Sequence, residues 1–494
     1  MKTVMRIIAL CLGCTILNAQ QTDGLRLLTL EDCIRIAKSQ SPSAQIVESS
    51  YYQQYWGYHS FQATLKPQVS FGGQLPGLER AINPITQEDG SIIFRAQSQS
   101  FSTINLGIRQ VLPWTGGTLA LTSSLDRIIQ LGNDMDVFQW QTTPLALQFW
   151  QPLFQYNPYK WDRQSEKLDY QIAGRKYVEE MEDISIEITN NFFDLFLAEV
   201  ALQTAKFNLS INDSIFTISQ GRYNVGKIAE NDLLQSELQL LDARSNLAKA
   251  ELAYGQAAQA LRIALGLPMN STPKISEPAK IPSVEVDPQK ALQEAQNNRS
   301  DVLAFESDLL EADRQIALAK SNRGFSANII ASVGFNQSAE SLSDAYKDPL
   351  DQERFNITFQ VPILQWGRAK ADMEAARSEK KRVESDIAVR EETFIKETYF
   401  QALEFQQARQ QLTLAAKSDT VARKRFSVSK NRYVIGKIDI TELFNAQRAK
   451  DDARQNYIET LRTFWVLYYQ LRRATLYDFE NDKSLIAESP QHES

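Results

Sequence analysis

Few side chains in this sequence are suited to catalysis or to metal binding. The chain has two histidines, His59 and His492, and only Cys33 remains as a cysteine once the predicted signal peptide is removed. Nucleophilic, zinc and haem sites need His and Cys in groups. A Gly-x-Ser-x-Gly motif and a phosphate-binding glycine loop are both missing. The sequence therefore predicts a protein that is not an enzyme and that carries no cofactor and no metal.

One motif occurs twice and gives more information than any other part of the chain. Gly221–Ile228 (GRYNVGKI) recurs 210 positions later as Asn431–Ile438 (NRYVIGKI). The same offset relates Phe149 to Phe359, and the register holds without a gap over about a hundred residues, which indicates duplication of one structural unit. Each copy is predicted to run from strand to long helix, tight turn and second long helix.

The glycines of this motif predict where the helices end. Gly226 and Gly436 supply a permissive backbone at which one helix stops and the next begins. Lys227 and Lys437 follow directly. The two turns are therefore expected to be exposed tips that a partner's helices can approach closely.

Composition and charge exclude other classes of protein. The 494 residues carry a net charge of −7, which argues against a nucleic-acid partner because phosphate binding needs clustered Lys and Arg. Sparse Gly and Pro with abundant polar residues favour long helices that have narrow apolar stripes. After the N-terminal region, no apolar stretch approaches the ~18 residues of a membrane helix. Any membrane contact is therefore expected to be made by strands.

The N-terminus predicts export. Lys2 and Arg6 precede an apolar run over Ile7–Leu17, so residues 1–19 are predicted to be a signal peptide cleaved after Ala19. Lipidation at Cys14 is the alternative. With one cysteine left, the exported chain has no intramolecular disulfide.

The remaining sequence divides into two repeats. The first covers residues 20–267 and contains a helix at about 28–63, strands within about 67–154, and a long helical hairpin with its tip near 224–226. A Pro-rich linker occupies 268–287. The second repeat covers 288–478, with a helix at about 288–321, strands within about 325–363 and a hairpin tip near 434–436. A polar tail, expected to be disordered from 480, ends the chain at 479–494.

The strands alternate apolar and polar side chains. Phe355, Ile357 and Phe359 alternate with Asn356 and Thr358. Such a strand places its apolar face against a second sheet in a small soluble domain, or against lipid in an outer-membrane barrel. Four clear strands per chain cannot close a barrel, since the smallest have about eight, whereas three copies give twelve. Two further segments, about 101–112 and 117–125, flank a turn at 113–117. Three arrangements are open for these two segments: they enlarge the barrel to eighteen strands, pair outside it, or form a separate hairpin. A twelve-stranded core without them is expected.

The chain resembles the TolC-type outer-membrane efflux proteins, also called outer membrane factors. The resemblance rests on the duplication, on the order of elements, and on a Tyr-x-Val-Gly or Tyr-x-Ile-Gly turn followed by Asp232-Leu233-Leu234 or Glu442-Leu443-Phe444; it covers about 28–478. It implies an α+β membrane protein: a homotrimer whose twelve-stranded transmembrane β-barrel continues as a long periplasmic α-helical coiled-coil tunnel. The implied location is the Gram-negative outer membrane, extending into the periplasm.

The resemblance also implies a gate near the tips. The positions of two acidic rings correspond to Glu442 and Asn445, the bonding tyrosine to Tyr433, and its acidic neighbourhood to Asp232. A basic residue is expected where this chain has Ile438, so one gate bond lacks its basic partner, and Asn445 carries no charge, so only one acidic ring is expected. The alternative role of Glu442 and Asp232 is that of first-turn carboxylates, which favour a helix N-terminus.

The function implied is that of an outer-membrane export channel in a tripartite efflux or secretion system. Such a passive conduit is opened by a periplasmic adaptor protein and by an inner-membrane RND, ABC or MFS transporter, with the adaptor docking at Gly226, Lys227, Gly436 and Lys437. Its other partners are outer-membrane lipid and two further copies of itself. The alternatives are the outer-membrane component of a type I protein secretion system and a non-channel adhesin-like coiled-coil trimer. Small molecules and polypeptides both remain open as cargo.

N-terminal sequencing tests the predicted export and signal-peptide cleavage. We expect the exported protein to begin at Gln20, because signal peptidase cuts after small residues. A chain that still begins at Met1 would contradict export, and a blocked N-terminus at Cys14 would favour the lipoprotein alternative.

Overall fold

The computed structural model describes residues 27–131, 136–278, 281–282 and 284–488. The predicted signal peptide and His492 lie outside these residues. The chain divides into two compact units. The helical unit comprises the chain up to Ile46, Met181–Glu285 and Leu403–Leu471, and the sheet unit comprises Val47–Glu180, Val286–Ala402 and the chain from Arg472 onwards.

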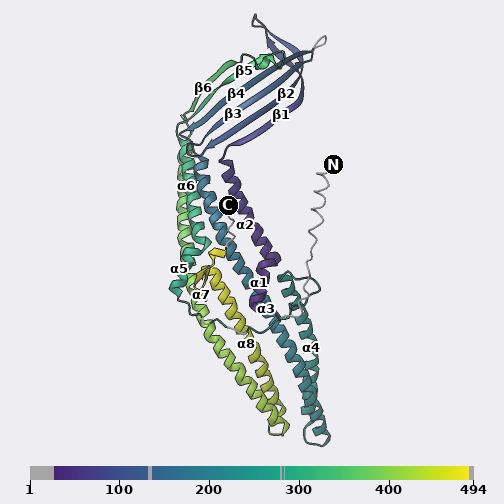
Figure 1. The fold of residues 1–494 in the computed structure, drawn as a ribbon. Helices are drawn as coiled ribbons and strands as arrows, with labels where there is room; N and C mark the ends of the chain where they lie inside the picture. The colour runs from purple at the N-terminus through teal and green to yellow at the C-terminus, as the bar shows by residue number, and fades with distance from the viewer. Residues whose placement is uncertain (1–26, 132–135, 279–280, 283, 489–494) are drawn as a thin grey trace, which may run out of the picture. The chain divides into compact units, whose positions relative to one another are not determined.

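The sheet unit is built on one antiparallel sheet whose six strands lie in chain order (Figure 1). The strands are β1 (Gln68–Thr86), β2 (Ile92–Leu112), β3 (Gly117–Gln130), β4 (Val137–Leu153), β5 (Ser326–Ala339) and β6 (Leu350–Gln360). A short 3-10 helix, η2 (Asp344–Tyr346), lies between β5 and β6. The last strand of the first repeat therefore pairs with the first strand of the second repeat, β4 with β5.

The sheet has more strands than the four that the sequence clearly predicts. The turn at 113–117 does connect a hairpin, with Leu112 opposite Gly117, and this hairpin forms β2 and β3 inside the sheet. The two segments of this hairpin, expected at about 101–112 and 117–125, extend further than the sequence predicts. Strand β1 continues to Thr86 and pairs with the first half of β2, for example Ile82 with Ala96. Backbone pairing satisfies this hairpin although its side chains alternate poorly.

The register places apolar side chains on one face of the sheet. Directly opposite residues of antiparallel strands share a face. One continuous row joins β1 to β5 through five apolar residues: Val69, Ile108, Leu121, Leu147 and Val333. On β6 the same face carries Phe355, Ile357 and Phe359.

The opposite face of the sheet is small and polar. The neighbouring row crosses all six strands through Ser70, Gly107, Thr122, Ala146, Gly334 and Gln352. The apolar face is exposed to a degree that a water-soluble sheet does not tolerate; Phe71 and Phe359 are 75% and 71% exposed. Both edge strands, β1 and β6, have one unpaired edge within the described part of the chain.

The helix that precedes the strands is broken in both repeats. The single helices expected at 28–63 and 288–321 are each two helices: α1 (Leu30–Gln40) and α2 (Pro42–Thr64), then α5 (Pro288–Asn298) and α6 (Ser300–Arg323). Ser41 and Arg299 interrupt them with extended ψ values of 152° and 146°. Ser41 is extended because the ring of Pro42 disfavours the helical conformation before it. Arg299 is held by an ion pair of 3.1 Å to Glu179.

The long helices repeat the offset found in the sequence. Helices α3 (Pro158–Asn224) and α7 (Arg368–Val434) have 67 residues each and begin 210 positions apart. They are followed by α4 (Glu230–Ala264) and α8 (Ile440–Thr475). No helix among the described residues is long and apolar enough to cross a bilayer. The largest fully buried side chains of the helical unit include Phe192, Phe193, Phe405 and Phe464.

The expectation of a disordered tail from 480 is wrong for residues 480–488. Here β7 (Tyr477–Asp478) pairs with β8 (Lys483–Ser484), and η3 (Ile486–Glu488) follows. Leu485 is fully buried against Leu476 and Val178 of α3. The Asp478 carboxylate accepts a hydrogen bond from Arg472 at 2.8 Å and another from the Asn481 N–H at 3.1 Å. These contacts hold the turn between β7 and β8. The segment is polar in composition, so the sequence did not indicate that it would be ordered. Burial of the apolar Leu485 supplies that order.

Cys33 provides a test of the packing at the start of the helical unit. Its thiol lies fully buried in α1. Burial, with a smaller contribution from the neighbouring Asp32 charge, raises the thiol pKa to about 12. Because the thiolate is the reactive form, we expect a maleimide at pH 7.5 to leave Cys33 unlabelled in the native protein and to label it fully in guanidinium chloride. Rapid labelling of the native protein would contradict the burial.

Candidate functional site: the helix tips

The two hairpin tips have the same backbone geometry. At the first tip, the Gly226 N–H donates to the Tyr223 carbonyl at 2.8 Å and the Lys227 N–H donates to the Arg222 carbonyl at 2.9 Å. At the second tip, Gly436 and Lys437 donate to the carbonyls of Tyr433 and Arg432 at 2.9 Å each. This pattern is the Schellman motif, which satisfies the free carbonyls at a helix end. The duplicated sequence therefore folds into a duplicated turn.

A positive φ angle explains the glycines. Gly226 and Gly436 have φ of 69° and 71°, a region in which residues other than glycine are strained. A Cβ atom added at either position would meet nothing within 4 Å. The glycines are therefore required by backbone conformation alone. The adjoining Val225 and Ile435 side chains are 67% and 65% exposed, so each tip presents an apolar residue beside a lysine.

Tyr433 forms part of a small core at the second tip. Only 5% of this residue is exposed, and it packs in a cluster with Phe426 and Ile440. The cluster also contains Ile215 of α3, Leu443 and Ala446, with Ile211, Ile438 and Phe444 at its margin. The hydroxyl of Tyr433 lies 3.4 Å from the Ser219 hydroxyl of α3. The predicted gate tyrosine thus joins α3 to the α7–α8 tip, and within the chain its hydroxyl contacts Ser219.

Arg222 is the residue of this site that sequence reasoning missed. Its guanidinium lies 5.1 Å from the centre of the Tyr433 ring and donates to the Tyr433 and Val434 carbonyls at 3.4 Å each. A cation over an aromatic ring is attracted by the ring's π-face, and a cation at the end of α7 also favours the helix dipole. The available signal was the repeated Arg-Tyr pair, because Arg222 and Arg432 occupy the same place in the two copies.

The predicted carboxylate positions are not brought together within one chain. Glu442 and Asn445 are exposed on α8, and Asp232 is half-buried on α4. The Glu442 N–H donates to Asp439 at 2.7 Å, so Asp439 caps the start of α8. Ile438, which stands where a basic residue was expected, packs against the Tyr433 cluster instead of forming a polar bond. Across the described residues, no group of three or more His, Cys, Asp or Glu side chains could hold a metal ion.

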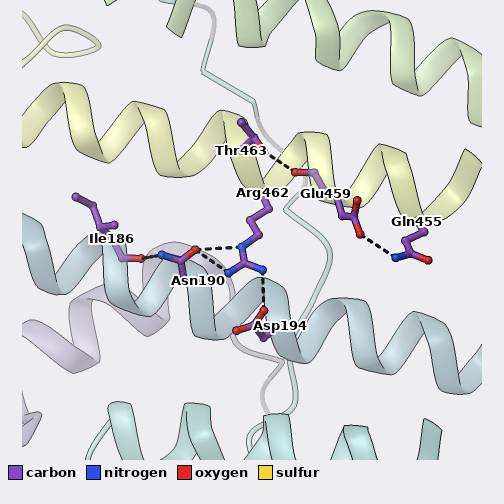
Figure 2. Close-up of polar contacts among 7 residues, drawn as sticks. All are labelled: Ile186, Asn190, Asp194, Gln455, Glu459, Arg462 and Thr463. Atoms are coloured by element: carbon purple, nitrogen blue, oxygen red, sulfur yellow. Dashed lines mark hydrogen bonds and ion pairs between the residues drawn. The ribbon is translucent and has the colours of Figure 1, made fainter. Parts of the chain in front are cut away.

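Polar contacts join α3 to α8 further along the helices (Figure 2). The Arg462 guanidinium donates twice to the Asn190 side-chain oxygen, at 3.0 and 2.9 Å, and once to Asp194 at 2.7 Å. The Asn208 amide of α3 likewise donates to Asp451 of α8 at 2.8 Å. Forked arginine contacts fix the register between two helices. These contacts are well suited to keep α8 aligned along α3.

The chain matches the family described as outer membrane efflux protein over residues 119–267 and 291–475. The match includes most of β3, all of β4, both long helical hairpins and both tips. It covers more than half of the chain.

Individual relatives are distant in sequence and close in fold. The toxin and drug export protein A of Aggregatibacter actinomycetemcomitans is 23% identical over 300 residues, which span 58% of this chain and 63% of that protein. The Campylobacter jejuni outer membrane channel CmeC has a TM-score of 0.66 at 14% identity, covering 90% of this chain and 85% of its own. A membrane protein from Pseudomonas aeruginosa has a TM-score of 0.65 at 15% identity, with 92% of each chain covered.

Substitutions at Tyr433 and Arg222 test the packing of the second tip. Tyr433→Ala removes a buried ring and should destabilise the tip by about 3 kcal/mol. Tyr433→Phe loses only a long hydrogen bond, worth about 0.5 kcal/mol, and Arg222→Gln should fall between the two. Hydrogen exchange of the amides at 426–446 is the measurement.

Arg432→Gln is the matched control, because Arg432 occupies the equivalent place in the repeat and is exposed. Equal protection in Tyr433→Ala and Tyr433→Phe would show that the ring does not hold the tip.

Proposed function

This chain belongs to the outer membrane efflux protein family, and we propose that three copies of it form the outer-membrane channel of an export system. In this proposal the sheets of the three copies close a transmembrane barrel. The helices continue it as a coiled-coil tunnel through the periplasm. The channel is a passive conduit that a periplasmic adaptor protein and an inner-membrane transporter of the RND, ABC or MFS class open and drive.

The sheet is the observation that supports the proposal most strongly. Its apolar face is exposed and its opposite face is small and polar. In an outer-membrane barrel the first face contacts lipid and the second lines a wet lumen. A single open sheet would leave the backbone groups at the edges of β1 and β6 unsatisfied in hydrocarbon, at a cost of several kcal/mol each. Pairing β6 of one copy with β1 of the next removes both edges.

The tips support the proposed gate. The α7–α8 tip is held on α3 by the Tyr433 cluster and by Arg222. Opening by outward movement of this tip would disrupt a small core and a cation–π contact, while the forked Arg462 contacts keep α8 in register. Opening therefore costs a limited amount of free energy, which docking of a partner can offset. The adaptor is proposed to dock at Gly226, Lys227, Gly436 and Lys437.

The proposed cargo has two classes. The name of the A. actinomycetemcomitans relative mentions both a toxin and drugs, so that protein's name favours neither polypeptides nor small molecules for this chain. The outer-membrane component of a type I protein secretion system is therefore the second candidate function. Both functions use the same conduit and differ in the inner-membrane partner.

Reconstitution tests the proposed channel. Protein purified from outer membranes should have the mass of three chains in native mass spectrometry and should give discrete current steps in planar lipid bilayers. A monodisperse, water-soluble monomer that gives no current would overturn the proposal. The reason is that an isolated sheet with this exposed apolar face requires lipid and neighbouring strands.

Glu442→Gln tests the proposed acidic ring. Three exposed Glu442 carboxylates around an axis would attract cations to the neck of the channel. We expect the wild-type channel to prefer K⁺ over Cl⁻ and the substitution to weaken that preference, as measured by the reversal potential in a KCl gradient. Asp232→Asn tests the second proposed gate position in the same way.

Glu230→Gln is the matched control, because Glu230 is also an exposed carboxylate in the first turn of a helix. A reversal potential that Glu442→Gln leaves unchanged would remove Glu442 from the gate.

A further inference from the structure

The hairpin of β2 and β3 occupies the middle of the sheet. β2 pairs with β1 from Gln68 to Thr86, and β3 pairs with β4 from Thr118 to Gln130. For the hairpin to lie outside a membrane wall, both ladders would have to separate and β1 would have to pair with β4 directly. Each backbone group left unpaired in hydrocarbon costs several kcal/mol. The pairing therefore favours a wall that includes the hairpin.

The hairpin also carries the apolar face without interruption. Ile108 of β2 lies opposite Val69 of β1, and Leu121 of β3 lies opposite Leu147 of β4. On the other face, Gly107 and Thr122 continue the small, polar row. In a hairpin that projected into water, the alternation of apolar and polar side chains would not need to match that of β1 and β4.

The lengths of the strands fit a membrane. A tilted transmembrane strand needs about 9–11 residues. β3 has 14 residues and the shortest strand of the sheet, β6, has 11. The hairpin strands are therefore as able to cross the hydrocarbon layer as the others.

Aromatic residues mark both ends of the apolar stretch. Trp114 in the β2–β3 turn is 77% exposed and lies at the same end of the sheet as Phe154 and Trp366, which are 73% and 89% exposed and follow β4 and β6. Further along β3, the Arg127 guanidinium lies 5.4 Å from the ring centres of both Phe138 and Trp140. Aromatic residues and arginine gather at the two membrane–water interfaces of such strands. The hairpin has both markers.

From these observations we propose that all six strands of each chain form part of the lipid-facing wall, so that three copies close a barrel of eighteen strands. This inference rests on the proposed function, because it assumes a barrel made by three copies. The expected twelve-stranded core is replaced by a wall with two more strands per chain. Because barrel diameter grows roughly in proportion to strand number, the barrel would be about 1.5 times as wide as one of twelve strands.

Spin labels on neighbouring residues distinguish the two barrels. The protein is reconstituted in liposomes with its remaining cysteine changed to serine, and a nitroxide is attached at Leu121→Cys or Thr122→Cys on β3. Collisions with oxygen, which dissolves in lipid, are compared with collisions with a water-soluble nickel complex. The proposal expects oxygen to dominate at position 121 and nickel at position 122, a reversal between adjacent residues.

Ile357→Cys and Thr358→Cys on β6 are the matched controls, because β6 belongs to the wall in either barrel. If β6 shows the reversal and both β3 labels favour nickel, the hairpin lies in water; if both β3 labels are shielded from oxygen and nickel, it packs against protein. Each result overturns the eighteen-stranded wall and leaves the channel intact. If the β6 labels also fail to alternate, the proposed function fails with it.

Discussion

An open sheet with one exposed apolar face is the constraint on which the rest of the structure depends. The backbone groups at the free edges of β1 and β6 need partners, and the apolar row from Val69 to Val333 needs a non-aqueous surface. One chain supplies neither. The proposed association with further copies in a lipid layer would meet both needs at once.

Duplication solves a second problem, that of building a long helical hairpin twice with the same ends. The Schellman turns at Gly226 and Gly436 repeat their hydrogen bonds, but the side chains around them have diverged. Tyr433 is buried in a core, whereas Tyr223, its counterpart, is exposed. Equal backbones with unequal packing allow one tip to be held and the other to remain accessible. The proposed gate, made from a repeated unit, would depend on such a difference.

Much of this arrangement could be predicted from local sequence. The glycine turns, the long helices and the β2–β3 turn follow from backbone chemistry that acts over a few residues. The helices α3 and α7 also keep the 210-residue offset of the repeat. Other features depend on contacts between distant residues. The contact of Arg222 with Tyr433 joins positions far apart in sequence, and the β1–β2 extension around Ile82 is held by backbone pairing instead of side-chain alternation. The two helix breaks differ in this respect. The break at Ser41 is signalled locally by Pro42, whereas no local residue signals the break at Arg299.

The buried position of Leu485 has a consequence for the order in which the chain matures. This side chain closes a small core with Val178, a residue more than three hundred positions earlier. The sheet unit therefore cannot complete its packing until the segment that carries Leu485 has reached Val178. The small core around Val178 is therefore completed by residues near 485, and the six strands alone do not finish the folding of the sheet unit.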